Sequence, residues 1–374
     1  MTRFPRHLVR ADLQAFDGYS SARTSFAGPP ARIWLNANEA AEPNRADPGG
    51  SVRRYPPPQP EPLRRSFADY LGARQSQVLL ARGSDEAIDG LVRTLCPPGS
   101  DAGIVVCPPT FGMYAVSAAV HGVPVHEVPQ VDAGHRFRHD LGAVADTVRR
   151  TGARVVFLDS PGNPTGSTVD PGQLDTLLGD LAEHSVVVLD EAYAEFDVAG
   201  RSWVPDLARH PHLAVLRTMS KAHGLAGARV GALVADPELV QVVGRVQAPY
   251  PLPAPAVEMA LSALAPEAIQ HTHARVAATA RRRERLAAVL AGHPGVATVY
   301  DSAANFVLVR SGEADSMLSR LREAAIAVRD MRHLPGLSDA LRVSVGTEEE
   351  IDAVVRALRD DRAPATALRE ERAP

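Results

Sequence analysis

The run Val186-Val187-Val188-Leu189-Asp190-Glu191-Ala192-Tyr193 begins with four apolar residues and ends with two carboxylates and a phenol. A continuous run rich in β-branched residues is typical of a strand that is buried on both faces, as in a parallel sheet. Similar runs recur on either side of it along the chain. The further candidate strands are Val78–Leu80, Gly103–Cys107, Val123–Val128, Val155–Asp159, Leu213–Thr218 and Val230–Ala235.

Segments of helical length, such as Asp85–Leu95 and Gly172–Glu183, lie between these candidate strands. Repeated strand–helix units predict an α/β fold in which helices cover both faces of a mostly parallel, seven-stranded sheet. Ligands bind such sheets beyond the carboxyl ends of the strands. The residues that follow each run are therefore the first candidates for a functional site.

A second, smaller α+β domain is expected after Pro249-Tyr250-Pro251-Leu252-Pro253, where the composition shifts. Its predicted parts are a long helix over Pro255–Leu290, strands at Asn305–Arg310 and Leu341–Val345, a helix near Ala314–Ala325 and a last helix from Glu348. We expect residues 1–50 to form an N-terminal arm and part of the small domain, residues 51–255 the large domain, and residues 256–374 the C-terminal small domain. The charged tail from residue 360 is expected to fray.

The composition narrows the possible partners and compartments. The net charge of −4 over 374 residues gives no reason to expect a nucleic-acid partner, which would favour a basic face. No apolar run is long enough to span a membrane, and the N-terminus has no apolar secretory region, so we expect a cytoplasmic protein. Cys96 and Cys107 are expected to be reduced and buried, and the scattered histidines predict no metal site.

The richest chemistry lies in Thr218-Met219-Ser220-Lys221-Ala222-His223-Gly224-Leu225-Ala226-Gly227-Ala228-Arg229, directly after a candidate strand. Lys221 can hold an aldehyde through its amine. Thr218 and Ser220 offer hydroxyl groups to a phosphate, and Arg229 offers a charged fork. A surface lysine in a polar loop is the plain alternative for Ser220-Lys221 taken alone. Together these groups suit pyridoxal phosphate, which carries both an aldehyde and a phosphate.

Three other segments meet the remaining needs of that cofactor. Asp190 ends a buried strand and can face a protonated pyridine nitrogen, with Tyr193 within reach of the phenolic oxygen, although an aspartate at this position could also simply cap a helix. Asn163, in the turn Ser160-Pro161-Gly162-Asn163-Pro164-Thr165-Gly166, is available to the same oxygen. Ser84 and Asp85 open a helix after a glycine, where backbone N–H groups can bind a phosphate.

Taken together, these segments resemble the fold-type-I pyridoxal-phosphate-dependent transferases, and within them the class-II aminotransferases of the histidinol-phosphate aminotransferase family. The resemblance covers nearly the whole chain. It is carried by Leu35-Asn36-Ala37-Asn38-Glu39, Arg54-Tyr55-Pro56, Pro108-Pro109-Thr110-Phe111-Gly112-Met113-Tyr114, Asp190-Glu191-Ala192-Tyr193, Arg217-Thr218-Met219-Ser220-Lys221, Ala248-Pro249-Tyr250-Pro251-Leu252, Asn305-Phe306 and Leu341-Arg342-Val343-Ser344-Val345-Gly346-Thr347.

The resemblance implies roles for further residues. Lys221, Asp190 and Tyr193 would carry the catalysis, Phe111 would stack on the cofactor ring, and Tyr55 would reach the cofactor phosphate of a neighbouring subunit in a homodimer. The substrate pocket would be lined by Tyr19, Asn38, Arg329 and Arg342. In this reading Arg342 binds the α-carboxylate of glutamate, and both arginines serve the phosphate of the other substrate.

The activity implied is a transamination between L-histidinol phosphate and 2-oxoglutarate, which yields imidazole-acetol phosphate and L-glutamate in histidine biosynthesis. Two alternatives stay open on the sequence. An aromatic amino-acid aminotransferase would use the same scaffold and need no phosphate on its substrate. A phosphothreonine decarboxylase would release carbon dioxide and would not depend on 2-oxoglutarate.

Overall fold

The computed structural model describes residues 3–21 and 31–359. Its main feature is a seven-stranded sheet with the order β1-β9-β8-β7-β6-β2-β3. The strands are β1 (Val78–Ala81), β2 (Ile104–Val106), β3 (Val125–Glu127), β6 (Val155–Asp159), β7 (Val186–Asp190), β8 (Leu213–Thr218) and β9 (Gly231–Ala235). All pairs are parallel except those of β9, which runs antiparallel to β1 and β8. The predicted mostly parallel sheet is confirmed, with β2 and β3 shorter than expected.

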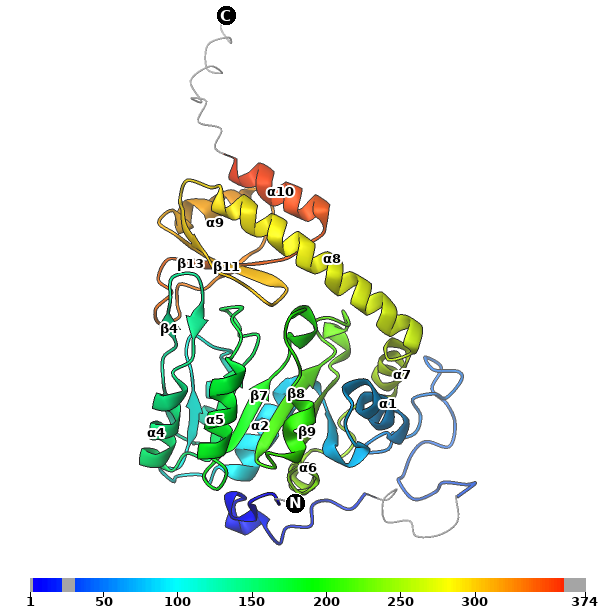
Figure 1. Cartoon of the computed structure of the whole chain (residues 1–374). Helices are drawn as coiled ribbons and strands as arrows, with labels where there is room; N and C mark the ends of the chain where they lie inside the picture. Colours follow the sequence, from blue (N-terminus) through cyan, green and yellow to red (C-terminus); the bar gives the residue numbers. More distant parts are fainter. Residues whose placement is uncertain (1–2, 22–30, 360–374) are drawn as a thin grey trace, which may run out of the picture.

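The sheet lies between two layers of helices (Figure 1). Alternate residues of each strand enter two separate cores, so the continuous apolar runs serve both faces. On one face lie α1 (Glu61–Leu71), α4 (Leu141–Thr151), α5 (Pro171–Asp180) and α7 (Ala254–Ala263). On the other face lie α2 (Gly83–Leu95), α3 (Met113–Val120) and α6 (Pro237–Val246).

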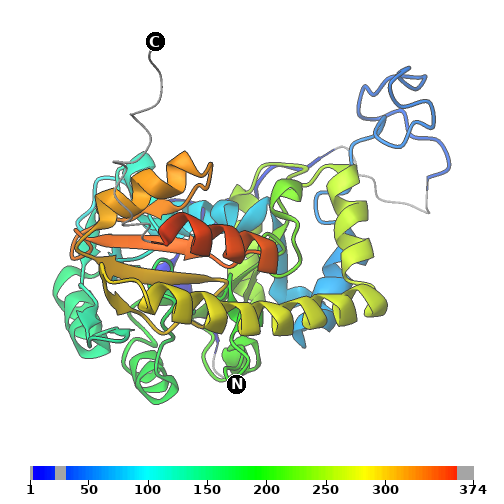
Figure 2. The same ribbon diagram turned by 90° about the horizontal axis from the view of Figure 1, so that it is seen from above.

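The N-terminal segment divides into two parts. Phe4, Leu8 and Val9 pack into the core beside α2 and α6, so these three residues belong to the large domain and not to the small one. Residues 31–58, blue in Figure 2, project away from the body of the chain. The domain boundaries expected near residues 51 and 256 stay a prediction.

The small domain is a four-stranded antiparallel sheet with the order β10-β11-β13-β12. Its strands are β10 (Val296–Val299), β11 (Phe306–Ser311), β12 (Arg329–Asp330) and β13 (Ala340–Ser344). Its core is shared with α8 (Pro266–Ala291), α9 (Ala314–Glu323) and α10 (Glu348–Leu358). The tail expected to fray, from residue 360, lies outside the described residues.

The prediction of one long helix over residues 255–290 was wrong. The segment forms two helices, because α7 ends at Ala263 and α8 begins at Pro266. A proline disfavours helical geometry in the residue before it, and Ala265 is accordingly extended, with ψ of 146°. Pro266 itself occupies the first turn of α8, where its missing N–H leaves no bond unmade.

Two connections fix the small domain against the large one (Figure 1). One is α8, which runs between the two domains. The other is the hairpin β4 (Val131–Asp132) and β5 (Phe137–Arg138), which packs Phe137 against Tyr300 with ring centroids 4.9 Å apart. The Tyr300 hydroxyl also donates to Asp132 Oδ2 at 2.6 Å. These two connections therefore hold the β13 side chains above the large sheet.

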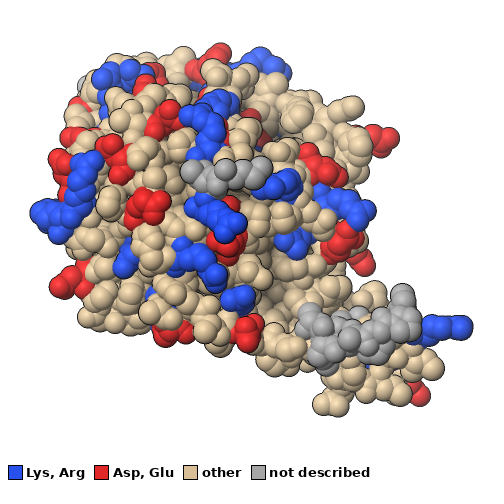
Figure 3. Space-filling model, turned by 60° about the horizontal axis from the view of Figure 1, so that its bottom comes forward, with Lys and Arg blue, Asp and Glu red and all other residues tan. Residues whose placement is uncertain are grey.

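The charges on the surface and the state of the two cysteines can be compared with what the composition predicted. On the face that Figure 3 shows, basic and acidic side chains are intermixed. Within residues 3–21 and 31–359, no helix is both long and apolar enough to cross a membrane. Cys96 and Cys107 are free and buried, as predicted.

Candidate active site

A cavity of about 130 Å³ lies where β6, β7 and β8 end. It brings together ten of the residues that the sequence predicted for cofactor binding, from six separate segments of the chain. These are Ser84, Asp85, Phe111, Asn163, Asp190, Tyr193, Thr218, Ser220, Lys221 and Arg229. Tyr114 and Asp159, to which the sequence assigned no role, line the same cavity.

Lys221 is the only lysine in the sequence, and it lies three residues beyond the end of β8. Its Nζ is 5.4 Å from the centre of the Tyr193 ring. Burial lowers the pKa of Lys221, and the Arg342 guanidinium lowers it further. A lowered pKa increases the share of free amine at neutral pH, which is the form that reacts with an aldehyde. On the next residue, the Ala222 carbonyl accepts a 2.9 Å hydrogen bond from Arg275 of α8.

Asp190 is the last residue of β7 and is 5% exposed. The Tyr114 hydroxyl donates to its Oδ2 at 2.8 Å, and the Ala192 N–H donates to its Oδ1 at 3.0 Å. Burial raises the pKa of Asp190 to about 6, against the two hydrogen bonds, which favour the ionised form. Asp190 is thus a buried carboxylate held in one orientation. The Tyr114 contact joins residues 76 positions apart, which sequence spacing does not show.

A cradle for a phosphate lies at the start of α2. The Thr218 and Ser220 hydroxyls are 2.9 Å apart, and Arg229 Nη1 is 3.4 Å from Ser220 Oγ. Two glycines permit this close approach. A Cβ at Gly83 would lie 2.6 Å from Arg229 Nη2, and one at Gly231 would lie 2.9 Å from the backbone N of Ser84. Helix-start N–H groups, hydroxyls and a guanidinium together suit a phosphate.

The small domain supplies two guanidinium groups above this cavity. Arg342 of β13 donates through Nη1 to Asn163 Oδ1, and its Cζ lies 5.1 Å from the centre of the Phe306 ring. The Nε of Arg342 is buried and has no hydrogen-bond partner among the described residues. Arg329 of β12 is paired with Arg342 across the strands. A buried guanidinium with a free N–H can bind a substrate anion.

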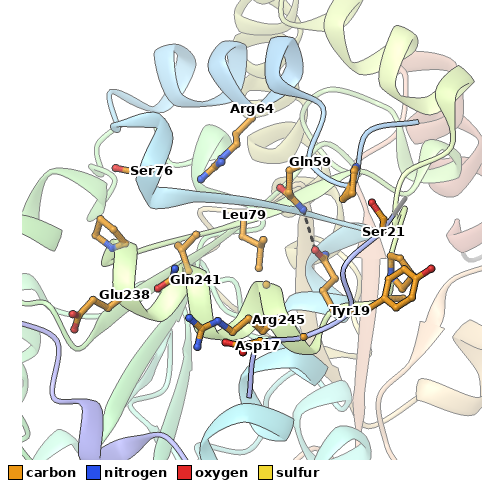
Figure 4. A pocket seen from close by; sticks show the side chains of 18 residues that line it. Asp17, Tyr19, Ser21, Gln59, Arg64, Ser76, Leu79, Glu238, Gln241 and Arg245 are labelled. Carbon is orange, nitrogen blue, oxygen red and sulfur yellow. Dashed lines mark hydrogen bonds between the residues drawn. The ribbon is translucent and has the colours of Figure 1, made fainter. Parts of the chain in front are cut away.

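Five predicted site residues do not line this cavity of their own chain, namely the small-domain arginines Arg329 and Arg342, and Tyr55, Tyr19 and Asn38. Tyr55 is 50% exposed and stacks on Tyr250, with ring centroids 4.7 Å apart. Tyr19 is 69% exposed and lies at one end of a separate hollow of about 590 Å³ beside α6 (Figure 4). Asn38 lies in the projecting segment, in a left-handed conformation with φ of 53°. The roles assigned to these residues stay predictions.

The side chains present fit pyridoxal phosphate. Its phosphate matches the cradle beside Gly83 and Gly231. Its aldehyde matches Lys221, the only lysine in the sequence, and its pyridine nitrogen matches the buried carboxylate of Asp190. Its phenolic oxygen matches Tyr193 and Asn163. Phe111 offers an aromatic ring to a flat ligand, and this ring is held edge-on by Tyr114 at 5.7 Å between centroids.

Comparisons with known proteins agree with this site. The family model for aminotransferase class I and II matches residues 24–358. The histidinol-phosphate aminotransferase of Stenotrophomonas maltophilia is 50% identical over 358 residues, which cover 96% of this chain and 97% of that protein. The protein of the same name from Xylella fastidiosa is 49% identical over 355 residues, 94% of this chain and 96% of that one.

Solved structures share the fold. The structure of histidinol-phosphate aminotransferase from Sinorhizobium meliloti in complex with pyridoxal-5'-phosphate aligns with a TM-score of 0.74 and 27% identity, over 86% of this chain and 88% of that one. L-threonine-O-3-phosphate decarboxylase from Porphyromonas gingivalis aligns with a TM-score of 0.69 and 21% identity, over 84% of this chain and 92% of that one. The second likeness is a likeness of fold alone.

Proposed function

The chain belongs to the class I and II aminotransferase family, and we propose that it is a pyridoxal-phosphate-dependent histidinol-phosphate transaminase. It interconverts L-histidinol phosphate and 2-oxoglutarate with imidazole-acetol phosphate and L-glutamate. The observation that carries this proposal is the meeting of Lys221 and Asp190 in one cavity with Arg342 of the small domain above it. The relatives that are about half identical over nearly the whole chain support the choice of substrate.

Each residue then has a task that its surroundings explain. When bound, pyridoxal phosphate supplies an electron sink for the carbon that carries the amine. Asp190 keeps a proton on the pyridine nitrogen, while Tyr193 and Asn163 hydrogen-bond the phenolic oxygen. Lys221 Nζ moves the proton to and from the amine-bearing carbon as a general acid–base. The phosphate is held by the backbone N–H groups of Ser84 and Asp85, by the hydroxyls of Thr218 and Ser220, and by the Arg229 guanidinium.

Substrate choice depends on the arginines. Histidinol phosphate has no carboxylate, so its phosphate is its only anion, whereas glutamate presents carboxylates. A guanidinium binds either group through two parallel hydrogen bonds, which lets one pocket accept both substrates. The unpartnered Nε of Arg342 among the described residues and its contact with Asn163 support this role. Arg329 is the neighbouring cation that can share the doubly charged phosphate.

A homodimer is part of the proposal. Residues 31–58 project from the body and carry exposed apolar side chains, among them Ile33 at 76% and Leu35 at 89% exposure. Exposed apolar groups of this size favour burial against another surface. We infer that a second copy covers them and that Tyr55 reaches the partner's cofactor phosphate. The two free, buried cysteines support a reducing compartment, and we propose the cytoplasm.

The test mixes purified protein with histidinol phosphate, glutamate, phenylalanine or phosphothreonine in single turnovers and follows the cofactor absorbance. Conversion to the amine form of the cofactor with histidinol phosphate and with glutamate is expected. A much faster reaction with phenylalanine would replace this proposal with the aromatic aminotransferase. Carbon dioxide release from phosphothreonine without any need for 2-oxoglutarate would replace it with the decarboxylase.

A further inference from the structure

Two carboxyl groups, and not one, line the cofactor cavity. Asp159 and Asp190 are paired residues at the carboxyl ends of the adjacent parallel strands β6 and β7. Both line the cavity, and they are only 3% and 5% exposed. Two like charges in one buried site raise each other's cost of ionisation. The function proposed above uses only Asp190, so the state of Asp159 needs its own explanation.

The two groups receive unequal numbers of hydrogen bonds. Asp190 accepts one on each oxygen, from the Tyr114 hydroxyl at 2.8 Å and the Ala192 N–H at 3.0 Å. Asp159 accepts one on Oδ2, from the Asn163 N–H at 2.8 Å. Its Oδ1 is buried without a well-aligned hydrogen bond among the described residues, and the Thr110 hydroxyl, which lies close by, is its only candidate donor there. A buried carboxyl with fewer donors is the one that keeps its proton.

We propose that Asp159 is a protonated carboxyl group of the cofactor cavity, and that Tyr114 is the positioning residue that makes Asp190, and not Asp159, the anion. The proposal rests on the proposed function, because it concerns the carboxylate that faces the pyridine nitrogen. Tyr114 can act in this way because it is fully buried and stacked on Phe157, with centroids 4.7 Å apart. Its hydroxyl therefore has a fixed position beside Asp190.

The charges around the pair agree with this assignment. Burial raises the pKa of Asp159 to about 7, an effect that the Asn163 N–H and the Thr110 hydroxyl oppose and that Asp190 increases. Burial raises the pKa of Asp190 only to about 6, because Tyr114 and Ala192 oppose it. No cation contacts Asp159 among the described hydrogen bonds and ion pairs. The titratable and charged groups that face the pair from the surrounding elements are Cys107, Tyr114, Tyr193, Lys221, Asp85 and Arg229.

The consequence is a cavity whose charge changes near neutral pH. Between the pKa of Asp190 and that of Asp159, the pair holds one negative charge, which Asp190 carries. Above the higher of these two values, Asp159 ionises and a second negative charge develops beside the first. That second charge favours protons on the pyridine nitrogen and on the Lys221 amine. Asp159 would thus couple the charge of the cofactor environment to pH.

Infrared difference spectroscopy on the cofactor-loaded protein tests the proposal directly, because a protonated carboxyl has its own C=O stretch. At about pH 6.5, which lies above the pKa of about 6 for Asp190 and below that of about 7 for Asp159, the wild type should show this band mainly from Asp159, and it should disappear by about pH 8. Asp159→Asn should remove the band and Asp190→Asn should retain it. A band that survives in Asp159→Asn, or its absence from the wild type, would overturn the proposal.

Tyr114→Phe provides a second, independent arm if Asp159→Asn folds poorly. Loss of the hydroxyl should add a protonated-carboxyl band from Asp190 and weaken cofactor binding by about tenfold, the scale of a lost hydrogen bond to a charged group. Tyr70→Phe is the matched control, since it removes a half-buried phenol that donates to Glu195 outside the cavity. An unchanged spectrum in Tyr114→Phe would contradict its role. Neither arm uses an amino donor, so failure of the transaminase proposal would show separately.

Discussion

At the scale of single residues, Arg342 has contacts that suit a binding group more than a structural one. One of its nitrogens holds Asn163, while Nε is buried without a described partner. Arg342→Ala should weaken the half-reactions of both glutamate and histidinol phosphate by about 2–4 kcal/mol each, the scale of a lost charge-assisted contact. Arg329→Ala should affect mainly histidinol phosphate. Single-turnover absorbance with each donor measures both effects.

Arg332→Ala is the control for these two variants. Arg332 lies near β12 but pairs outward with Asp330 and Asp315, so its loss should change neither half-reaction. If Arg342→Ala slowed neither donor, the substrate assignment would fail, although the aminotransferase family would stand.

The second residue-scale prediction concerns the stability of the cofactor-free protein. The pKa of Asp159 is raised from 3.8 to about 7 by burial, so the folded state binds a proton that the unfolded state has released between these values. The stability of the folded state therefore falls as pH rises from about 4 to about 7, by at most about 4 kcal/mol, because the unfolded chain gains from ionising Asp159 while the folded chain does not. Asp159→Asn keeps an acceptor for the Asn163 N–H but removes this cost.

Thermal unfolding at several pH values checks the prediction. The variant should unfold at a higher temperature than the wild type at about pH 8, and the difference should vanish at about pH 4. A variant less stable than the wild type at the higher pH would show that Asp159 is ionised and stabilising in the native state.

The sequence predicted those site residues that immediately follow a strand or open a helix. Lys221, Asp190 and Asn163 could be chosen because a buried apolar run predicts a strand. The residues at the carboxyl end of such a strand lie at the edge of the sheet where ligands bind. Tyr114 and Asp159 were given no role from the sequence, for a different reason. Tyr114 meets Asp190 only through the packing of α3 against the sheet, and Asp159 reads as the last residue of a strand until its donors are counted.

At the scale of elements, Gly231 lets β9 approach the start of α2. A Cβ there would lie 2.8 Å from both the Arg217 carbonyl oxygen and the Gly83 carbonyl carbon, which are backbone atoms that cannot move aside. Gly231→Ala should therefore force the phosphate cradle open, destabilise the protein by about 1–3 kcal/mol and weaken cofactor binding. Gly227→Ala is the matched control, because a Cβ there meets nothing within 4 Å.

Cofactor titration and denaturant unfolding of the two glycine variants give the comparison. Equal effects of Gly231→Ala and Gly227→Ala on both measurements would mean that the close approach of β9 and α2 does not shape the cradle.

Strands could be predicted from the sequence where they are completely buried, and their prediction was ambiguous where they are partly exposed. The five longest strands of the large sheet are fully buried, and their hydrophobic pattern alone marked them. By contrast, β4 is exposed and β12 has only two residues, so neither gives a periodic signal. The break between α7 and α8 was missed because the apolar periodicity continues across Pro266.

At the scale of the whole molecule, the account requires two chains for one complete site. Tyr55 is exposed and stacked on Tyr250, outside the cavity of its own chain. If Tyr55 serves the partner's cofactor, mixing an inactive Tyr55→Ala protein with an inactive Lys221→Ala protein should restore activity, because a hybrid dimer carries one intact site. Activity after confirmed subunit exchange is the measurement. No recovery would mean that each chain builds its site alone.

We propose that this cavity binds pyridoxal phosphate through Lys221. The composition of the chain makes this proposal easy to test. Lys221 is the only lysine in the sequence, so the N-terminal amine is its only competitor for an aldehyde. The measurement is borohydride reduction of the cofactor-loaded protein followed by mass spectrometry of its peptides. We expect one cofactor per chain, covalently attached to the peptide that contains Lys221, and none attached in Lys221→Ala. A cofactor attached to the N-terminus, or none attached to the wild type, would contradict it.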